Sequence, residues 1–286
     1  MTTTLTRSSR GRAWLTLAAL FILGASLAWG LVIFLWSLAA HTGPSNPPDV
    51  PSQTVSRAPT VTGTRAMVAA APSAPGPDGG AVTAVQDELA NRPMASVSPA
   101  AARPQPLAAA PPAGGAIVVP GASDPAAGLP RGFPRTPQGA VAQLAAIDAA
   151  AFRDVNPATV ADVHHRATRP GAVPLSQWSP NVGVTAILRA VGQPDGATVL
   201  TSTWTLTHAQ VKGVLDRGDF VLACVLGELD ATYHSTARAG VGDCQRMLWA
   251  DGHWWIGPGA QPAFAPSTWP GSADCVAAGW QEAHHA

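Results

Sequence analysis

The stretch that decides the fold is DFVLACVLGEL, residues 219–229, followed by TARAGVGDCQRMLWA, residues 236–250. In the first segment, residues at odd and at even positions are both apolar, which predicts a β-strand covered on both faces. The second predicts another strand, and Asp251-Gly252 is a strong two-residue hairpin signal before a strand at 253–257. A run rich in β-branched residues at 198–207 predicts one more strand. These segments together predict an antiparallel meander.

The three cysteines lie in or after this meander. If 219–229 and 236–250 form a hairpin about residue 234, Cys224 and Cys244 lie equally far from the turn and face each other. In an oxidising compartment that geometry predicts a disulfide. Cys275 is then left over. A Cys244–Cys275 bond and an intermolecular bond through Cys275 stay open as alternatives.

Short helices are expected before the meander. Thr136-Pro137 is typical of a helix start, and apolar residues recur at helical spacing through 138–153. Asn156-Pro157 repeats the start signal for a second helix that ends near Arg166, and Ser179-Pro180 begins a third. Helices followed by an antiparallel sheet predict an α+β domain, assigned to residues 131–286.

A long segment before this domain has a different composition. Residues 41–130 contain no Phe, Trp, Tyr or Cys and hold more than half of the 28 prolines of the chain. Such a segment buries too little apolar area to offset its ordering entropy, so we expect a disordered Pro/Ala-rich linker. Within it, residues 85–92 are predicted to form two helical turns, either transiently or as a short docking motif.

The N-terminal region predicts a membrane anchor. Residues 13–40 are apolar and uncharged, and a helix of that length spans about 42 Å. Arg7, Arg10 and Arg12 precede it, so the positive-inside rule places residues 1–12 in the cytoplasm and the C-terminal domain outside. The alternative is a signal peptide cleaved after Ala39, but the apolar stretch exceeds the usual length of such a segment.

The search for chemistry finds no catalytic, cofactor-binding or metal-binding constellation. His164 and His165 are adjacent on a predicted helix and point about 100° apart, which does not suit one metal. His253 is expected on a strand surface, and His284-His285 at a frayed terminus. Glu228 and Asp230 share a strand face but have no partner base or nucleophile. We therefore predict neither an enzyme nor a cofactor.

Three segments of the domain carry a resemblance to a known family. They are GFPRTPQGAV at 132–141, DCQRMLWADGHWWIGP at 243–258 and APSTWPGS at 265–272. With the anchor and linker, they resemble single-pass membrane proteins of conjugative elements from GC-rich bacteria. The resemblance implies a cone-like domain similar to the nuclear-transport-factor-two-like domains of type IV secretion scaffolds. It also implies the Cys224–Cys244 pairing, and Cys275 departs from the family pattern.

The function implied by this resemblance is structural. We expect an assembly component of a conjugative transfer apparatus, which anchors an extracytoplasmic protein-interaction domain to the cell membrane through strand faces or the Trp-rich tail. The expected partners are the membrane, other proteins of the apparatus and, through the small residues Gly24 and Ala28, a second copy. Because 17 Lys and Arg balance 17 Asp and Glu, no direct contact with nucleic acid is expected.

Two alternatives use the same fold. An extracytoplasmic module could bind a small ligand inside the cone, with Trp178, Trp204 and Trp255 as candidate pocket lining. Core packing is the competing interpretation of these tryptophans. The other alternative is an enzyme that uses Glu228 or Asp230 as its acidic residue.

Overall fold

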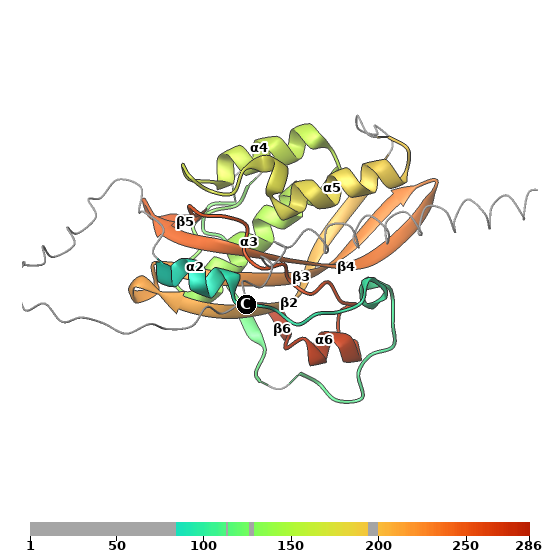
Figure 1. Cartoon of the computed structure of the whole chain (residues 1–286), viewed down its shortest axis with the longest axis horizontal. Coiled ribbons are helices and arrows are strands. Elements are labelled where there is room, and N and C mark those ends of the chain that lie inside the picture. The colour runs from blue at the N-terminus through green and yellow to red at the C-terminus, as the bar shows by residue number, and fades with distance from the viewer. Residues whose placement is uncertain (1–83, 113, 126–128, 194–199) are drawn as a thin grey trace, which may run out of the picture.

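A curled, mostly antiparallel sheet with three helices against one face forms the body of the domain (Figure 1). The computed structural model describes residues 84–112, 114–125, 129–193 and 200–286. The sheet order is β1-β6-β2-β3-β4-β5. The strands are β1 (Ile117–Val119), β2 (Thr201–Leu215), β3 (Phe220–Tyr233), β4 (Ser235–Ala250), β5 (His253–Ile256) and β6 (Gln281–His285). The helices are α2 (Ala84–Asn91), α3 (Pro137–Phe152), α4 (Pro157–Ala167), α5 (Ser179–Ala190) and α6 (Ala273–Ala277), with 3-10 turns at Pro99–Ala102, Leu175–Gln177 and Asp216–Gly218. This confirms the α+β class.

The β3–β4 hairpin has the predicted arrangement. Its turn is at His234, which has a φ of 57°, and Cys224 is in register with Cys244. The second hairpin turns at Asp251 and Gly252, both with positive φ, as a two-residue loop requires. β3 is buried on both faces for most of its length, as its continuous apolar pattern predicts.

The three helices begin at the predicted residues, and side chains cap the first two. The Thr136 side chain accepts a hydrogen bond from Gly139 N, and the Asn156 side chain accepts one from Ala158 N. α3 lies between the sheet and α4–α5 and is buried on almost every side. Its apolar side chains, with Val221, Ala223 and Val225 of β3, make the main core.

Two segments differ from the sequence-based expectation. β2 continues to Leu215 instead of ending near residue 207. Bulges near Thr207 and Lys212 absorb the irregular part of its sequence, so its pairing with β3 continues beyond them. The tail after residue 259 contains α6 and β6, so its end is not the frayed terminus that was expected at His284-His285. β6 pairs with β2 and, in parallel, with β1, so His284 and His285 belong to a strand.

Gly227 on β3 supports a close contact with the Trp204 ring. A Cβ atom at this position would lie 2.1 Å from Trp204 Cε2. We expect Gly227→Ala to displace the buried ring and to destabilise the domain by about 1–3 kcal/mol, the usual cost of overpacking. Denaturant unfolding measures the change. Gly121→Ala is the control, because no atom lies within 4 Å of a Cβ there; equal stability of the two variants would contradict the prediction.

The predicted boundary at residue 131 requires a correction. Residues 84–112 and 114–125 are here called the strap (Figure 1). Its first part, with α2, packs on the sheet face opposite α3–α5, and its later part adds the edge strand β1 beside β6. Leu89 and Ala90 of α2 cover Phe220 and Leu222. The strap therefore belongs to the folded domain. Residues 41–83, 113 and 126–128 of the predicted linker lie outside the described residues.

Polar contacts hold the strap along its length. Asp87 forms an ion pair of 2.8 Å with Arg246, whose side chain is only 2% exposed. Ala263 N donates to Ala90 O, Trp269 N donates to Ala101 O, and Ala108 N donates to Gly271 O. The amino-acid composition of the strap did not predict that it is folded. Most of these contacts are made by its backbone, and their partners lie in a part of the chain that is distant in sequence.

The proposed anchor lies outside the part of the chain that the structure describes. Residues 13–40 belong to the undescribed N-terminal region. Among the described helices, none combines the length and the apolarity that crossing a bilayer requires.

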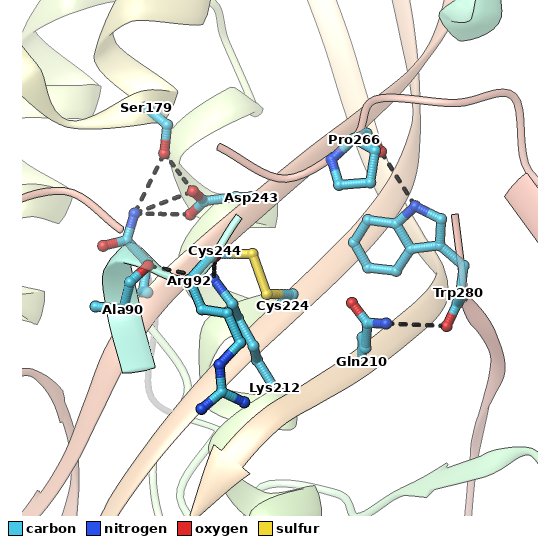
Figure 2. The surroundings of a disulfide bond; sticks show 12 residues. Ala90, Arg92, Ser179, Gln210, Lys212, Cys224, Asp243, Cys244, Pro266 and Trp280 are labelled. Atoms are coloured by element: carbon cyan, nitrogen blue, oxygen red, sulfur yellow. Dashed lines mark hydrogen bonds between the residues drawn. A yellow bond between two sulfur atoms is a disulfide. The ribbon is translucent and has the colours of Figure 1, made fainter. Parts of the chain in front are cut away.

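The disulfide joins Cys224 and Cys244 under the strap, and this confirms the predicted pairing (Figure 2). It packs in a small apolar cluster with Leu226, Ala265 and Trp280, whose indole Nε1 donates to Pro266 O at 3.1 Å. Cys275 lies in the same cluster as a free, fully buried thiol, which rules out the Cys244–Cys275 alternative. Burial raises the pKa of this thiol. It is therefore a packing residue.

Candidate functional site

The three tryptophans proposed as pocket lining do not lie together. Trp178 is fully buried, and its ring centroid lies 5.2 Å from that of His164. Trp204 is buried in the same core, where it packs on Gly227. Trp255 lies outside that core and is partly exposed. Trp178 and Trp204 thus serve as core packing, and Trp255 has a different environment.

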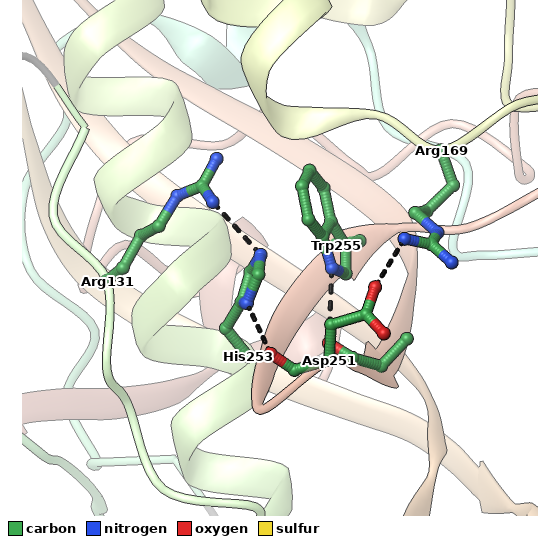
Figure 3. Close-up of polar contacts among 6 residues, drawn as sticks. Arg131, Arg169, Asp251, His253 and Trp255 are labelled. Atoms are coloured by element: carbon green, nitrogen blue, oxygen red, sulfur yellow. Dashed lines mark hydrogen bonds and ion pairs between the residues drawn. The ribbon is translucent and has the colours of Figure 1, made fainter.

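Trp255 lies between two guanidinium groups (Figure 3). The Arg131 Cζ atom is 4.8 Å from the Trp255 ring centroid, and the Arg169 Cζ atom is 5.4 Å from it. The His253 ring contacts the same indole, with a centroid separation of 4.2 Å. These four residues, Arg131, Arg169, His253 and Trp255, are here called the Trp255 face.

Hydrogen bonds hold the Trp255 face in place. Arg131 donates to Arg166 O at 2.8 Å and contacts His253 Nε2 at 3.0 Å. His253 Nδ1 lies 3.1 Å from Asp251 O, so Nδ1 carries the proton and Nε2 accepts from Arg131. Burial, which outweighs the carbonyl contact, lowers the pKa of His253 and keeps the ring neutral. Since both ring nitrogens are occupied, His253 is poorly suited to act as a base.

Distant segments bring these side chains together. The Asp251-Gly252 hairpin places Trp255 on β5, while Arg131 precedes α3 and Arg169 follows α4. Arg169 reaches across to Asp251 with an ion pair of 2.6 Å. The sequence indicated Trp255 and His253 but gave no signal for the two arginines, because their contacts are long-range.

The other residues considered for chemistry have structural partners. Glu228 and Asp230 both pair with Arg238 on the neighbouring strand. His164 Nε2 contacts Val173 O at 2.8 Å, which ties α4 to the following loop. His284 pairs with Glu282 at 3.3 Å on the ordered strand β6. Each of these side chains therefore has a structural partner in the fold.

A buried carboxyl pair was not found by the sequence analysis. Asp148 on α3 and Asp243 on β4 are 1% and 3% exposed. Burial and the neighbouring Asp243 raise the pKa of Asp148 well above its usual range. Burial also raises the pKa of Asp243, against hydrogen bonds from Ser179 and Gln245. Asp148 is thus the carboxyl that holds a proton. No spacing rule joins two acidic residues 95 positions apart.

Stability should therefore depend on pH through Asp148. Its pKa is raised on folding, so its contribution is present at pH values below about 4 and is lost as the pH rises through the folded pKa. Asp148→Asn, which stays neutral and can donate to Asp243, should gain stability relative to the wild type as the pH increases over that window. Denaturant unfolding of both proteins at a series of pH values measures this difference. Asp154→Asn, at an exposed position, reports the effect of removing a surface carboxylate; a parallel course for the two variants would refute the assignment.

Comparison of the chain with protein-family models, with curated proteins and with solved structures found no match.

Proposed function

We propose that this chain is an anchored assembly component of a conjugative, type IV secretion-like transfer apparatus, and that the Trp255 face is its contact surface for another protein of that apparatus. The anchor at residues 13–40 would hold the domain outside the cytoplasm. This role requires a rigid domain with a preformed contact surface and no catalytic group.

The Trp255 face is the observation that carries the proposal. Trp and Arg are the residues most enriched at the energetic centres of protein interfaces. Here the indole is partly exposed, and contacts with Arg131, Arg169 and His253 hold it in position before any partner arrives. Because its side chains are already ordered, such a face loses little conformational entropy on binding. The Trp-rich tail, the other surface considered, is unsuited because Trp269 and Trp280 are buried.

The ligand-binding alternative has less support. Trp178 and Trp204 fill the core between the helices and the sheet instead of lining a space. Hollows of about 250 and 280 Å³ flank the strap helix α2 on the opposite side of the sheet. Neither hollow is lined by the tryptophans that the ligand hypothesis requires.

Replacing Trp255 tests the proposed contact. Trp255→Ala should weaken the partner complex by about 2 kcal/mol or more, roughly 30-fold in affinity, as expected for a hot-spot residue. We expect DNA transfer from donor cells to fall while the protein level in the membrane and the melting temperature stay close to wild type. A photoreactive phenylalanine analogue at position 255 should crosslink to another protein of the apparatus.

Phe264 provides the matched control, because it is an exposed aromatic residue (59%) outside the Trp255 face. Phe264→Ala should transfer DNA normally, and the photoreactive residue at position 264 should give no such crosslink. Normal transfer by Trp255→Ala would disprove the role of this face.

A further inference from the structure

The contact between Arg131 and His253 in the Trp255 face exists only while the histidine ring is neutral. The Arg131 Nη1 atom lies 3.0 Å from His253 Nε2. A guanidinium group can only donate hydrogen bonds, so Nε2 is an unprotonated acceptor. The other ring nitrogen, Nδ1, lies 3.1 Å from the carbonyl oxygen of Asp251 and holds the single proton of the neutral ring. Figure 3 shows the imidazole between these two partners.

A second proton on the imidazole would reverse this contact. Protonation at Nε2 turns the acceptor into a donor that faces an N–H group of Arg131. It also places two positive charges on groups whose nearest nitrogens are 3.0 Å apart. Both the loss of the acceptor and the Coulomb repulsion oppose the contact. Arg131 therefore has to move away when His253 becomes charged.

The charged groups around the imidazole ring do not offset a second proton. Arg131 before α3, Arg169 after α4 and Asp251 of the hairpin all act on the ring. The carboxylate of Asp251 is 65% exposed and is already paired with Arg169 at 2.6 Å. Farther out, Arg166 of α4 pairs with Asp162 at 2.6 Å, so this pair adds no net charge. The unbalanced charge next to the ring is thus the guanidinium of Arg131.

The direction of the pH dependence follows from these surroundings. Burial lowers the pKa of His253, and the charges of Arg131 and Arg169 lower it further, whereas the carbonyl and carboxylate of Asp251 raise it. The ring is therefore neutral above its ordinary pKa of 6.5 and becomes charged only as the pH falls below that value, through the lowered pKa of the folded state. The described form of the face is thus its neutral-pH form.

Arg131 holds several parts of the face together, so its release changes the whole surface. Its guanidinium lies 4.8 Å from the centroid of the Trp255 ring and donates to Arg166 O at 2.8 Å. The His253 ring, with its centroid 4.2 Å from that of the indole, would itself become a cation beside the indole on protonation. Two cations that repel each other would then compete for one aromatic ring. The face loses the ordered arrangement that a partner would meet.

We propose that the Arg131–His253 contact makes the Trp255 face a pH-sensitive contact surface, which is assembled at neutral pH and releases Arg131 on acidification. This inference rests on the proposed function, because it adds the regulation of the same surface. Both residues are partly exposed, so a proton can reach the ring from solvent without unfolding of the domain. The contact with the partner should be strong in a neutral medium and weak in an acidic one.

NMR titration of the purified full chain tests the switch without a partner. In protein with isotope-labelled histidine and arginine, the His253 ring should titrate below pH 6.5, and the Arg131 Nε–H signal should shift with the same midpoint. His253→Gln identifies the ring signal and offers an amide oxygen in place of Nε2, which does not titrate in this range. In that variant the Arg131 signal should not follow the pH. Arg131→Gln identifies the arginine signal and should raise the pKa of His253, because it removes a nearby cation.

His165→Gln is the matched control, because His165 is exposed on α4. It should leave the shifts of both signals unchanged. An Arg131 signal that stays fixed while His253 titrates would overturn the proposal. So would a His253 ring that stays neutral until the domain unfolds.

DNA transfer by donor cells separates failure of the switch from failure of the proposed function. Transfer is compared in media above and below the His253 midpoint measured by NMR. Wild type and His165→Gln should lose about ten-fold more transfer on acidification than His253→Gln, the effect of losing one ordered contact residue. This ratio does not depend on how well His253→Gln transfers DNA at neutral pH. If NMR shows the switch but acidification affects all three proteins equally, the pH-sensitive arrangement is confirmed and the proposed contact function is refuted.

Discussion

A chain that begins at residue 127 should not fold cooperatively, although it retains α3–α5 and the strands from β2 onward. Loss of the strap exposes Phe220 and Leu222 and removes the burial of Leu89, which contributes about 2 kcal/mol. It also removes the carboxylate that pairs with Arg246 and the strand β1 that pairs with β6. These losses together approach the whole stability of a typical domain, about 5–15 kcal/mol. Denaturant unfolding of chains beginning at residues 84 and 127 measures the difference.

A single substitution in the strap isolates its strongest polar contact. Arg246 donates through Nε to Ala260 O, and its carboxylate partner is Asp87. Asp87→Ala leaves a buried guanidinium without a counter-ion, which typically costs 3–5 kcal/mol. Because Asp87 itself is half exposed, water can partly replace it, and we expect about 3 kcal/mol.

The neighbouring Glu88→Ala is the control, since Glu88 is exposed on the same helix. It should change stability by no more than about 0.5 kcal/mol. If the chain beginning at residue 127 unfolds as cooperatively as the one beginning at 84, the strap is not part of the domain. Equal stability of the Asp87 and Glu88 variants would show that the Asp87–Arg246 ion pair does not stabilise the domain.

Removal of the Cys224–Cys244 disulfide is the second large effect. The bond links residues 20 positions apart, and closing a loop of that size contributes about 3 kcal/mol through the entropy of the unfolded chain. Cys224→Ala and Cys244→Ala should each lower the free energy of unfolding by about 2–4 kcal/mol, and the double variant should lose about the same. Reduction of the wild type should reproduce the loss.

Cys275→Ala is the comparison, because it removes a buried sulfur without breaking a bond. It should cost about 1 kcal/mol, the price of a small cavity. Peptide mapping without reductant should recover Cys224 linked to Cys244. A linked peptide that contains Cys275, or an equal loss from all three single variants, would contradict this assignment.

The sequence by itself determined the elements whose signals are local. The apolar run at 219–229 gave a strand buried on both faces, and the equal spacing of Cys224 and Cys244 from His234 gave their register. The caps Thr136 and Asn156 placed two helices. These features were predictable because strand periodicity, turn geometry and capping involve residues that are close in the chain.

Only the tertiary structure decided what covers the outer face of β3 and which side chains surround Trp255. The strap carries few large apolar residues, so its composition resembles that of a disordered segment. It becomes ordered because the sheet, more than 100 residues later, offers Phe220, Leu222 and Arg246 as partners. Likewise, Arg131 meets Trp255, and Asp148 meets Asp243, through contacts across the fold. Such contacts leave no periodic pattern in the sequence, because each depends on where the chain returns in space.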